Sequence, residues 1–441
     1  MEGSNQAAPV DVENPYIPLE TSMRQELGRL SPISSSCCIY RVPERFRRVN
    51  ENAYTPQVVS IGPLHHGKKG LEAMEEHKKR YLQEFLCRTK VSLEDCIKKI
   101  RDQEARLRSC YAETNGFSSD EFVRIILVDA AFIVELLLKH NGRTPRKEND
   151  RIFNKPVMFH DIMTDMQLLE NQLPFFILED LFYLQEGTLS SDSDTSDDRL
   201  STFVTDLSLK FFTSTMILMY QADQEFILKR LSSTKKVEHF LDLILRSLCQ
   251  SEVVPSIPLE DITTPSVTEL YHAGVKFKVG SRKNIFDIRF TDGILEIPKI
   301  AVEDHTEISL RNLLAFEQCH YQHCYVCDYM IMMDRFVNNA SDVDLLVDRG
   351  IIENVLGDRK EVAALFNNLG IGIFGSHDFT FANLCQDLNR YCSSTRHKRM
   401  ANLRQNYFNT PWRTLSVIAA VVLLILTLIQ TVCSIISAAR A

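Results

Sequence analysis

The chain has 441 residues, of which 44% are hydrophobic and 24% are charged. These proportions are typical of a folded globular protein and exclude a chain that is disordered throughout. The net charge of -8 excludes nucleic-acid binding as the main role, because no excess of cations is present to neutralise phosphates.

The first residues, 1–35, are rich in Pro, Ser, Asn and acidic side chains, which predicts a flexible lead to the folded body. They contain neither the basic start nor the apolar stretch of a secretory signal peptide. The 12 cysteines are scattered along the chain instead of forming a compact disulfide pattern. We therefore expect reduced thiols in a cytosolic body.

Helices are predicted in series after a turn-rich first stretch. The spacing of apolar residues predicts a helix over 71–89 and a second helix capped by Ser92. The stretch 122–138 is apolar almost all round, which predicts a central buried helix. A helix over 161–184 should be kinked or split at Pro174, because proline lacks an amide donor.

An acidic loop and the strand patterns follow. Residues 186–201 are acidic and rich in serine, which predicts a disordered insertion, with phosphorylation of its serines as an alternative role. Strand patterns occur over about 275–300, where Asp292-Gly293 predicts a hairpin turn. A helix is then expected over about 307–338. The predicted fold class is mainly α, with a helical body at 36–395 and one small antiparallel hairpin or meander.

The C-terminal stretch differs from the rest of the chain. Between Arg413 and Arg440 no charged side chain occurs, and 414–439 is long enough to cross a bilayer as a helix. The basic residues of 396–413 precede this stretch and Arg440 alone follows it, so the positive-inside rule places the body in the cytosol. We predict a single-pass tail anchor after a basic juxtamembrane helix end, in the plasma membrane or alternatively in an internal membrane.

Polar residues of the predicted span share one helical face. They are Thr427, Gln430, Thr431, Ser434 and Ser437. Polar side chains in lipid favour hydrogen bonds between helices, so this face is a candidate for association of the span with itself or with another protein's span. The alternative is an incidental run of small residues near the far interface.

A set of strings occurs in a characteristic order. They read RVPERFRRVNENAYTPQVVSIGPLHHG, LEAMEEHKKRYL, VDAAFIVELL, LLENQLPFFIL, TELYHAGVKFK, LEIPKI and NLLAFEQCH. With the C-terminal span, they resemble a large land-plant family known as domain of unknown function 247, from about Cys37 to the end. Leu64 and Ala130 depart from it, standing where an aromatic residue and a glycine are usual. The resemblance implies a membrane-tethered plant protein with no known enzymatic activity, and some relatives are implicated in pollen–stigma self-incompatibility in grasses.

The most metal-like residues are Cys319, His320, His323, Cys324 and Cys327. On a continuous helix, residues four apart such as His320 and Cys324 share a face, and thiolate and imidazole are good zinc ligands. However, one helix rarely completes a tetrahedral site alone, and the paired spacing of zinc fingers is absent. We therefore expect buried cysteines, surface histidines and no cofactor, while the sequence leaves metal binding by these residues open.

Two further polar groups stand beside apolar runs. Glu170, Asn171 and Gln172 are expected to be buried hydrogen-bonding residues that fix helix packing, not catalysts. Four arginines within 41–48 form a basic cluster, which we interpret as a solvated or internally paired face. The acidic loop or an anionic lipid surface is an alternative partner for these arginines.

The sequence contains no GxSxG, HExxH or P-loop motif, which favours a non-enzymatic role. Gly370, Gly372 and Gly375 form a literal GxGxxG, but a helical pattern precedes it, so we interpret it as a glycine-rich turn between helices. Our first interpretation is a membrane-tethered recognition or signalling protein that binds another protein. The resemblance allows a role like self-incompatibility, or in stress or development signalling. An unrecognised membrane-tethered enzyme and a structural scaffold are the alternatives. An enzyme should show a deep pocket lined by convergent titratable groups, whereas a binding module should show a broad exposed patch.

Overall fold

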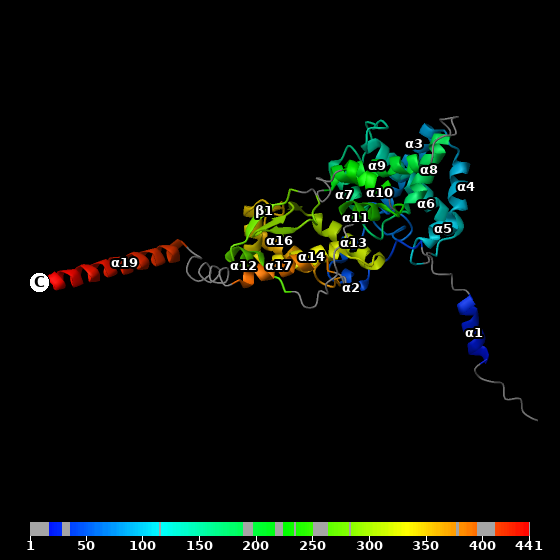
Figure 1. Ribbon diagram of the computed structural model, residues 1–441. Helices are drawn as coiled ribbons and strands as arrows, with labels where there is room; N and C mark the ends of the chain where they lie inside the picture. The colour runs from blue at the N-terminus through cyan, green and yellow to red at the C-terminus, as the bar shows by residue number, and fades with distance from the viewer. Residues whose placement is uncertain are drawn as a thin grey trace, which may run out of the picture.

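A computed structural model gives the fold (Figure 1). It describes residues 17–28, 36–113, 116–187, 197–216, 224–232, 235–249, 263–281, 284–375, 379–394 and 411–440. Helix accounts for 62% and strand for 5% of the described residues, so the predicted mainly helical class is confirmed.

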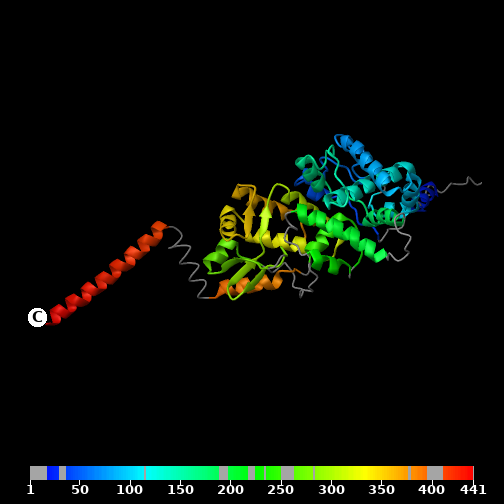
Figure 2. The ribbon, with the colours of Figure 1, turned by 90° about the horizontal axis from the view of Figure 1, so that it is seen from above.

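The body consists of two helical groups that share one continuous hydrophobic core. The elements of the first group and of the segment before it are α1 Ile17–Gly28, α2 Glu44–Arg47, η1 Glu51–Tyr54 (a 3-10 helix), α3 Glu72–Thr89, α4 Leu93–Asp102, α5 Glu104–Ser109, α6 Ser119–His140, α7 Pro156–Asp165, α8 Phe175–Gly187, α9 Asp197–Thr215, α10 Gln224–Ser232 and α11 Phe240–Leu248. The later elements are α12 Val267–His272, β1 Lys276–Val279, β2 Arg289–Thr291, β3 Ile294–Ile297, β4 Ile300–Val302, α13 Thr306–His320, α14 Tyr325–Phe336, α15 Ala340–Asp348, β5 Ile352–Asn354, α16 Arg359–Leu369, α17 Ala382–Ser393 and α19 Pro411–Arg440. Figures 1 and 2 show the two groups side by side, with α11 and α13 near the junction and α19 projecting beyond the second group.

Helix α6 is the centre of the first group, as its sequence predicts. A capping box begins it, in which Ser118 accepts the amide hydrogen of Glu121 and the Glu121 side chain accepts that of Ser118. Its side chains are buried almost continuously from Phe122 to Lys139, and α3, α4, α8 and α9 pack around it. Each fully buried Leu, Ile or Phe here contributes about 1.5–3 kcal/mol relative to an exposed position.

The sheets correct one prediction. Asp292 and Gly293, with φ of 51° and 78°, form the predicted turn between the antiparallel strands β2 and β3. Strand β1, however, pairs parallel with β3. Strand β3 lies in the middle of the sheet, in the order β1-β3-β2. The predicted antiparallel meander is therefore wrong for β1. A second parallel pair, β4 with β5, joins segments about 50 residues apart in the sequence and was not predicted.

Helix boundaries bring further corrections. The predicted flexible lead contains helix α1, and the rest of 1–35 lies outside the described residues. Helices α7 and α8 are separated at Pro174, so the predicted split is confirmed. The helix predicted over 166–173 is wrong, because the side chains of Asn171 and Gln172 bond to backbone carbonyl oxygens in a non-helical stretch there. The acidic loop is shorter than predicted, because α8 includes Gly187 and α9 begins at Asp197; 188–196 lie outside the described residues.

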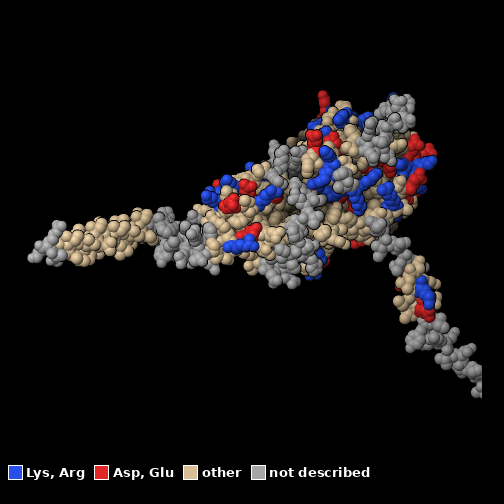
Figure 3. Space-filling model, viewed as in Figure 1, with Lys and Arg blue, Asp and Glu red and all other residues tan. Residues whose placement is uncertain are grey.

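Helix α19 contains a candidate membrane span at Leu415–Ile436, with a mean hydropathy of 2.6. None of its most apolar window is buried against the body, and Figure 3 shows the described side chains of this helix free of charged colours. An apolar surface of this extent, exposed on every side, is typical of a helix whose surroundings are not water. The predicted basic segment lies largely outside the described residues, which resume at Pro411.

Candidate functional site

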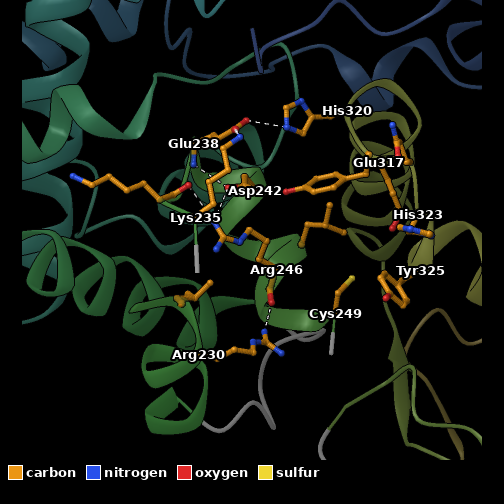
Figure 4. Close-up of a pocket in the computed structure, with 15 residues that line it drawn as sticks. Arg230, Lys235, Glu238, Asp242, Arg246, Cys249, Glu317, His320, His323 and Tyr325 are labelled. Atoms are coloured by element: carbon orange, nitrogen blue, oxygen red, sulfur yellow. Dashed lines mark hydrogen bonds and ion pairs between the residues drawn. The ribbon is translucent and has the colours of Figure 1, made fainter. Parts of the chain in front are cut away.

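A pocket of about 350 Å³ opens where the two helical groups meet. Figure 4 shows Lys235, Glu238 and Asp242 on one wall and Glu317, His323 and Tyr325 on the opposite wall. The first wall comes from α10, α11 and the segment between them, and the second comes from the end of α13 and the start of α14. Titratable side chains from segments about 80 residues apart thus converge on one cavity.

The second wall exists because the predicted helix over 307–338 is broken. Helix α13 ends at His320, where the extended backbone of Tyr321 follows, and α14 begins after its N-cap residue Cys324. Glu317 bridges the break, because its carboxylate accepts the amide hydrogens of Val326 and Cys327 at 3.0 and 2.9 Å. A carboxylate at the first turn of a helix satisfies amides that have no partner within the helix.

Glu238 is the most strongly ion-paired acid of the pocket. One of its oxygens lies 3.0 Å from Nε2 of His320, and the other pairs with the ammonium of Lys235. Burial raises the pKa of Glu238, but the contacts with His320 and Lys235 outweigh it and hold the pKa at about 2. His320 is oriented in turn by the hydroxyl of Tyr40, 3.0 Å from its Nδ1.

Asp242 is held by donors that the fold supplies. It accepts the Tyr321 hydroxyl at 2.6 Å and the Glu238 amide at 2.9 Å, and the guanidinium of Arg246 lies 3.5 Å away. Burial, together with the charge of Asp242, raises the pKa of the Tyr321 phenol. This network fixes the position of Asp242 in the pocket wall.

Glu317, which is buried, and Cys249, which is half-buried, are two further titratable groups of the pocket wall. Burial raises the pKa of Glu317 to about 7, against the two amide hydrogen bonds that favour its charged form. Burial also raises the pKa of the Cys249 thiol well above its ordinary value. A thiol that stays protonated at neutral pH is a poor nucleophile.

The remaining lining gives the pocket a mixed character. Leu231 and Leu245 supply apolar surface, whereas the exposed lysines Lys235 and Lys236 stand on the rim. The carboxylates of Glu238, Asp242 and Glu317 each form an ion pair or accept a hydrogen bond within the described part of the wall. The pocket therefore combines an apolar surface with a basic rim and with acids that the fold itself pairs.

The predicted cysteine–histidine set does not gather in one place. His320 faces Glu238 and Tyr40, and the exposed His323 lies on the pocket wall. The predicted shared face of His320 and Cys324 is wrong, because the helix ends between them. Cys324 and Cys327 do come together, and they do so with Glu317, which sequence analysis missed. No proline or glycine marks the break that brings the three together.

The polar residues Glu170, Asn171 and Gln172 are buried and hydrogen-bonded, which confirms their predicted burial and hydrogen bonding. Glu170 accepts the Val42 amide at 2.7 Å and pairs with Arg47. Asn171 accepts the Ile61 amide at 2.7 Å, and Gln172 donates to carbonyl oxygens of the non-helical stretch before Pro174. These residues tie the first part of the body to α7 and α8, and they do not line the pocket.

The four arginines within 41–48 are largely paired with other residues of the body, which is one of the two arrangements predicted for this cluster. Arg41 and Arg47 both reach Glu170, and Arg48 lies 3.5 Å from Glu44. Arg45 lies over the ring of Phe46, with its guanidinium carbon 4.6 Å from the ring centroid. The cluster therefore has structural partners within the described body.

The polar face of the span is exposed, as far as its side chains are described. The hydroxyls of Thr427 and Thr431 donate to the carbonyl oxygens of Leu423 and Thr427, each at 2.8 Å. Gln430 and Ser434 are exposed, and the Ser437 side chain lies outside the described residues. The threonines thus satisfy their donors within their own helix.

Comparisons with known proteins identify the family of this chain. The family described as "Plant protein of unknown function", domain of unknown function 247, matches residues 39–426. The UPF0481 protein At3g47200 of Arabidopsis thaliana is 30% identical, over 91% of this chain and 87% of its own length. A second UPF0481 protein of Arabidopsis thaliana, At3g02645, is 24% identical over 94% of this chain and 93% of its own length. No solved structure matches the chain. Because the family model matches most of the chain, the chain belongs to the plant family of domain of unknown function 247.

Proposed function

We propose that this protein is a membrane-tethered recognition protein, not an enzyme, whose body faces the cytosol at the plasma membrane. The observation that supports it is the span Leu415–Ile436, which is apolar, exposed and 22 residues long. A helix of that length extends about 33 Å, which matches the hydrocarbon core of a bilayer. The body that such an anchor would hold presents a pocket with an apolar wall and a basic rim.

The partner that best fits this pocket is a protein segment with an apolar side chain next to an acidic one. Leu231 and Leu245 would contact the apolar side chain, and the rim lysines Lys235 and Lys236 would attract the acidic group. Glu238 already pairs with Lys235 and His320, and Asp242 accepts the Tyr321 hydroxyl. Because both carboxylates have partners within the fold, the pocket favours binding over proton transfer.

Fractionation of plant cells tests the anchor. We expect the full chain to stay with membranes after alkaline extraction and a chain ending at residue 410 to be released. The exposed Asn339, with Ser341 two residues on, forms a glycosylation sequon and reports orientation. A cytosolic body leaves Asn339 unmodified in isolated membranes, whereas glycosylation there would reverse the proposed orientation.

Proximity labelling with the full chain tests recognition. The variant Lys236→Glu reverses a charge on the rim, and Lys360→Glu reverses one at an exposed position in α16 away from the pocket. We expect Lys236→Glu, but not Lys360→Glu, to lose specific labelled proteins while staying in the same membrane. Identical labelled sets for the three chains would contradict a role of this pocket in recognition.

A membrane-tethered enzyme is the rival, and one observation favours it. Titratable groups converge on the pocket, as expected of an active site. The variant His320→Gln separates the two readings, because it removes a titratable group while keeping a side chain that can hydrogen-bond. Retained partner labelling with this variant supports recognition, whereas accumulation of an unprocessed metabolite or substrate protein in its presence would support an enzyme.

A further inference from the structure

Three potential metal ligands lie together behind the pocket wall. The carboxylate of Glu317 and the sulfur atoms of Cys324 and Cys327 all lie within 4.8 Å of one another, and all three side chains are buried. Glu317 comes from the last turn of α13, while Cys324 is the N-cap residue of α14 and Cys327 lies in its first turn. The break between the two helices therefore builds the cluster.

The buried carboxylate lacks a cationic side chain. Its hydrogen-bond donors are the amides of Val326 and Cys327 and the Cys327 thiol, and no ion pair to Glu317 occurs within the described part of the chain. A carboxylate group has about four lone-pair positions, so these three contacts leave room for a further one. A buried acid without a counter-ion is costly, and a bound cation would offset that cost.

The surroundings of the two sulfur atoms also suit metal binding. The side-chain nitrogen of Gln318 lies 3.4 Å from the Cys327 sulfur and 4.0 Å from the Cys324 sulfur. The same nitrogen donates to the Phe374 carbonyl oxygen at 2.6 Å, which fixes its position. Hydrogen bonds from N–H groups to ligand sulfur atoms are the usual support of a metal–thiolate site. The positive end of α14, a helix of 12 residues, adds to this support.

We propose that Glu317, Cys324 and Cys327 bind one Zn²⁺ ion, with a water molecule from the adjoining pocket as the fourth ligand. Two thiols and a carboxylate form a donor set that zinc accepts and that magnesium or calcium does not favour. Binding would release the thiol protons and bring the ligand atoms to about 2.0–2.3 Å from the ion. Ligand atoms within 4.8 Å of one another can reach these positions by side-chain rotation. Because Glu317 also lines the pocket, the ion would lie beside whatever the pocket holds.

The test uses the full chain, purified in detergent with a reducing agent. Elemental analysis should find one equivalent of zinc, and exchange for Co²⁺ should give a thiolate-to-cobalt charge-transfer band in the near ultraviolet. Cys324→Ser and Cys327→Ser should each weaken binding at least tenfold and reduce the band. Gln318→Leu, which removes only the supporting hydrogen bonds, should weaken it about tenfold.

Matched controls separate the site from general effects. Cys319→Ser changes a half-buried thiol of α13, the helix that carries Glu317, and should leave the cobalt charge-transfer band unchanged. Near-ultraviolet circular dichroism checks that each variant is folded. A folded chain with no zinc and no band after Co²⁺ addition would overturn the proposal. So would a band that survives in both Cys324→Ser and Cys327→Ser, or a disulfide between these cysteines in freshly isolated, metal-free protein.

Discussion

The ammonium of Lys78 lies 2.5 Å from a carboxylate oxygen of Asp129, and both side chains are buried between α3 and α6. The same ammonium donates to the Ser60 carbonyl oxygen at 2.8 Å, and the second Asp129 oxygen accepts the Gly62 amide at 2.8 Å. This buried pair therefore fastens the turn-rich stretch before α3 to helices α3 and α6.

Lys78→Met should be strongly destabilising, because it leaves the Asp129 charge buried without its cation. We expect the free energy of unfolding to fall by about 3–5 kcal/mol, measured by chemical denaturation in detergent. The double variant Lys78→Met/Asp129→Leu removes both charges and should recover part of that loss. A single variant as stable as the parent chain would show that solvent or another group compensates Asp129.

Gly62→Ala should cost more than Gly67→Ala, although both glycines have similar backbone angles. Gly62 has φ of +74° and a Cβ there would lie 2.7 Å from the Gln172 carbonyl oxygen. Gly67 has φ of +77° with nothing within 4 Å of an added Cβ. We expect about 1 kcal/mol for the backbone strain at Gly67 and at least 2 kcal/mol more at Gly62, compared by thermal or denaturant unfolding. Equal losses would mean that the Gln172 segment moves aside easily.

Glu170→Gln should loosen the stretch that contains Val42. Val42 and Arg47 contact one carboxylate oxygen, whereas His65 and Arg41 contact the other. In the variant only one of these positions keeps an oxygen acceptor, and the NH₂ group at the other faces donors. We expect a loss of about 3 kcal/mol and faster amide hydrogen exchange at Val42. Glu113→Gln, which removes the exposed partner of Arg41, is the control and should cost less than 1 kcal/mol.

Local patterns in the sequence predict the helices well, and tertiary pairings poorly. The apolar run of α6 and the cap at Ser92 have short-range causes, and both predictions are confirmed. Burial of Glu170 could be inferred from its apolar neighbours, but its partner Arg47 is 123 positions away and carries no local signal. Likewise, alternation identifies β3 as a strand without indicating that it lies between β1 and β2.

The pocket shows the same limit. Its titratable residues look unremarkable in the sequence, because Glu238 and His320 meet only in the folded chain. The break after α13 is decisive, yet residues 321–324 contain neither proline nor glycine. The break is stabilised by Glu317, whose carboxylate caps α14 from the preceding helix. Tertiary capping of this kind overrides the helical periodicity that predicts one continuous helix.

Glu238 should make stability depend on pH in the acidic range. Its pKa is about 2 in the folded chain, below the ordinary value of 4.5, so the folded state binds fewer protons than the unfolded state. The stabilisation is fully present above pH 4.5 and is lost as the pH falls towards 2. Glu238→Gln should therefore cost about 1 kcal/mol at pH 7, after allowance for solvent screening, and progressively less below pH 4.5.

Denaturation of the parent chain and Glu238→Gln at several pH values checks this. Glu353→Gln removes an exposed carboxylate that pairs with Lys299, and it should change stability by less than 1 kcal/mol at pH 7. A difference between Glu238→Gln and the parent chain that stays constant from pH 7 to pH 3 would contradict the role of the pairs with His320 and Lys235.

The polar face of α19 leads to a last prediction about self-association. Thr427 and Thr431 already donate to carbonyl oxygens of their own helix, whereas the Gln430 amide is exposed and can bond to a second span. We propose that any association through this face depends mainly on Gln430, since a hydrogen bond between helices in lipid contributes about 0.6–2 kcal/mol. Gln430→Leu should therefore weaken association measurably in a membrane two-hybrid assay, while Thr427→Val should change it little. Equal signals for the parent chain and Gln430→Leu would assign the polar face no role in association, and a larger loss for Thr427→Val would place the contact on the threonines.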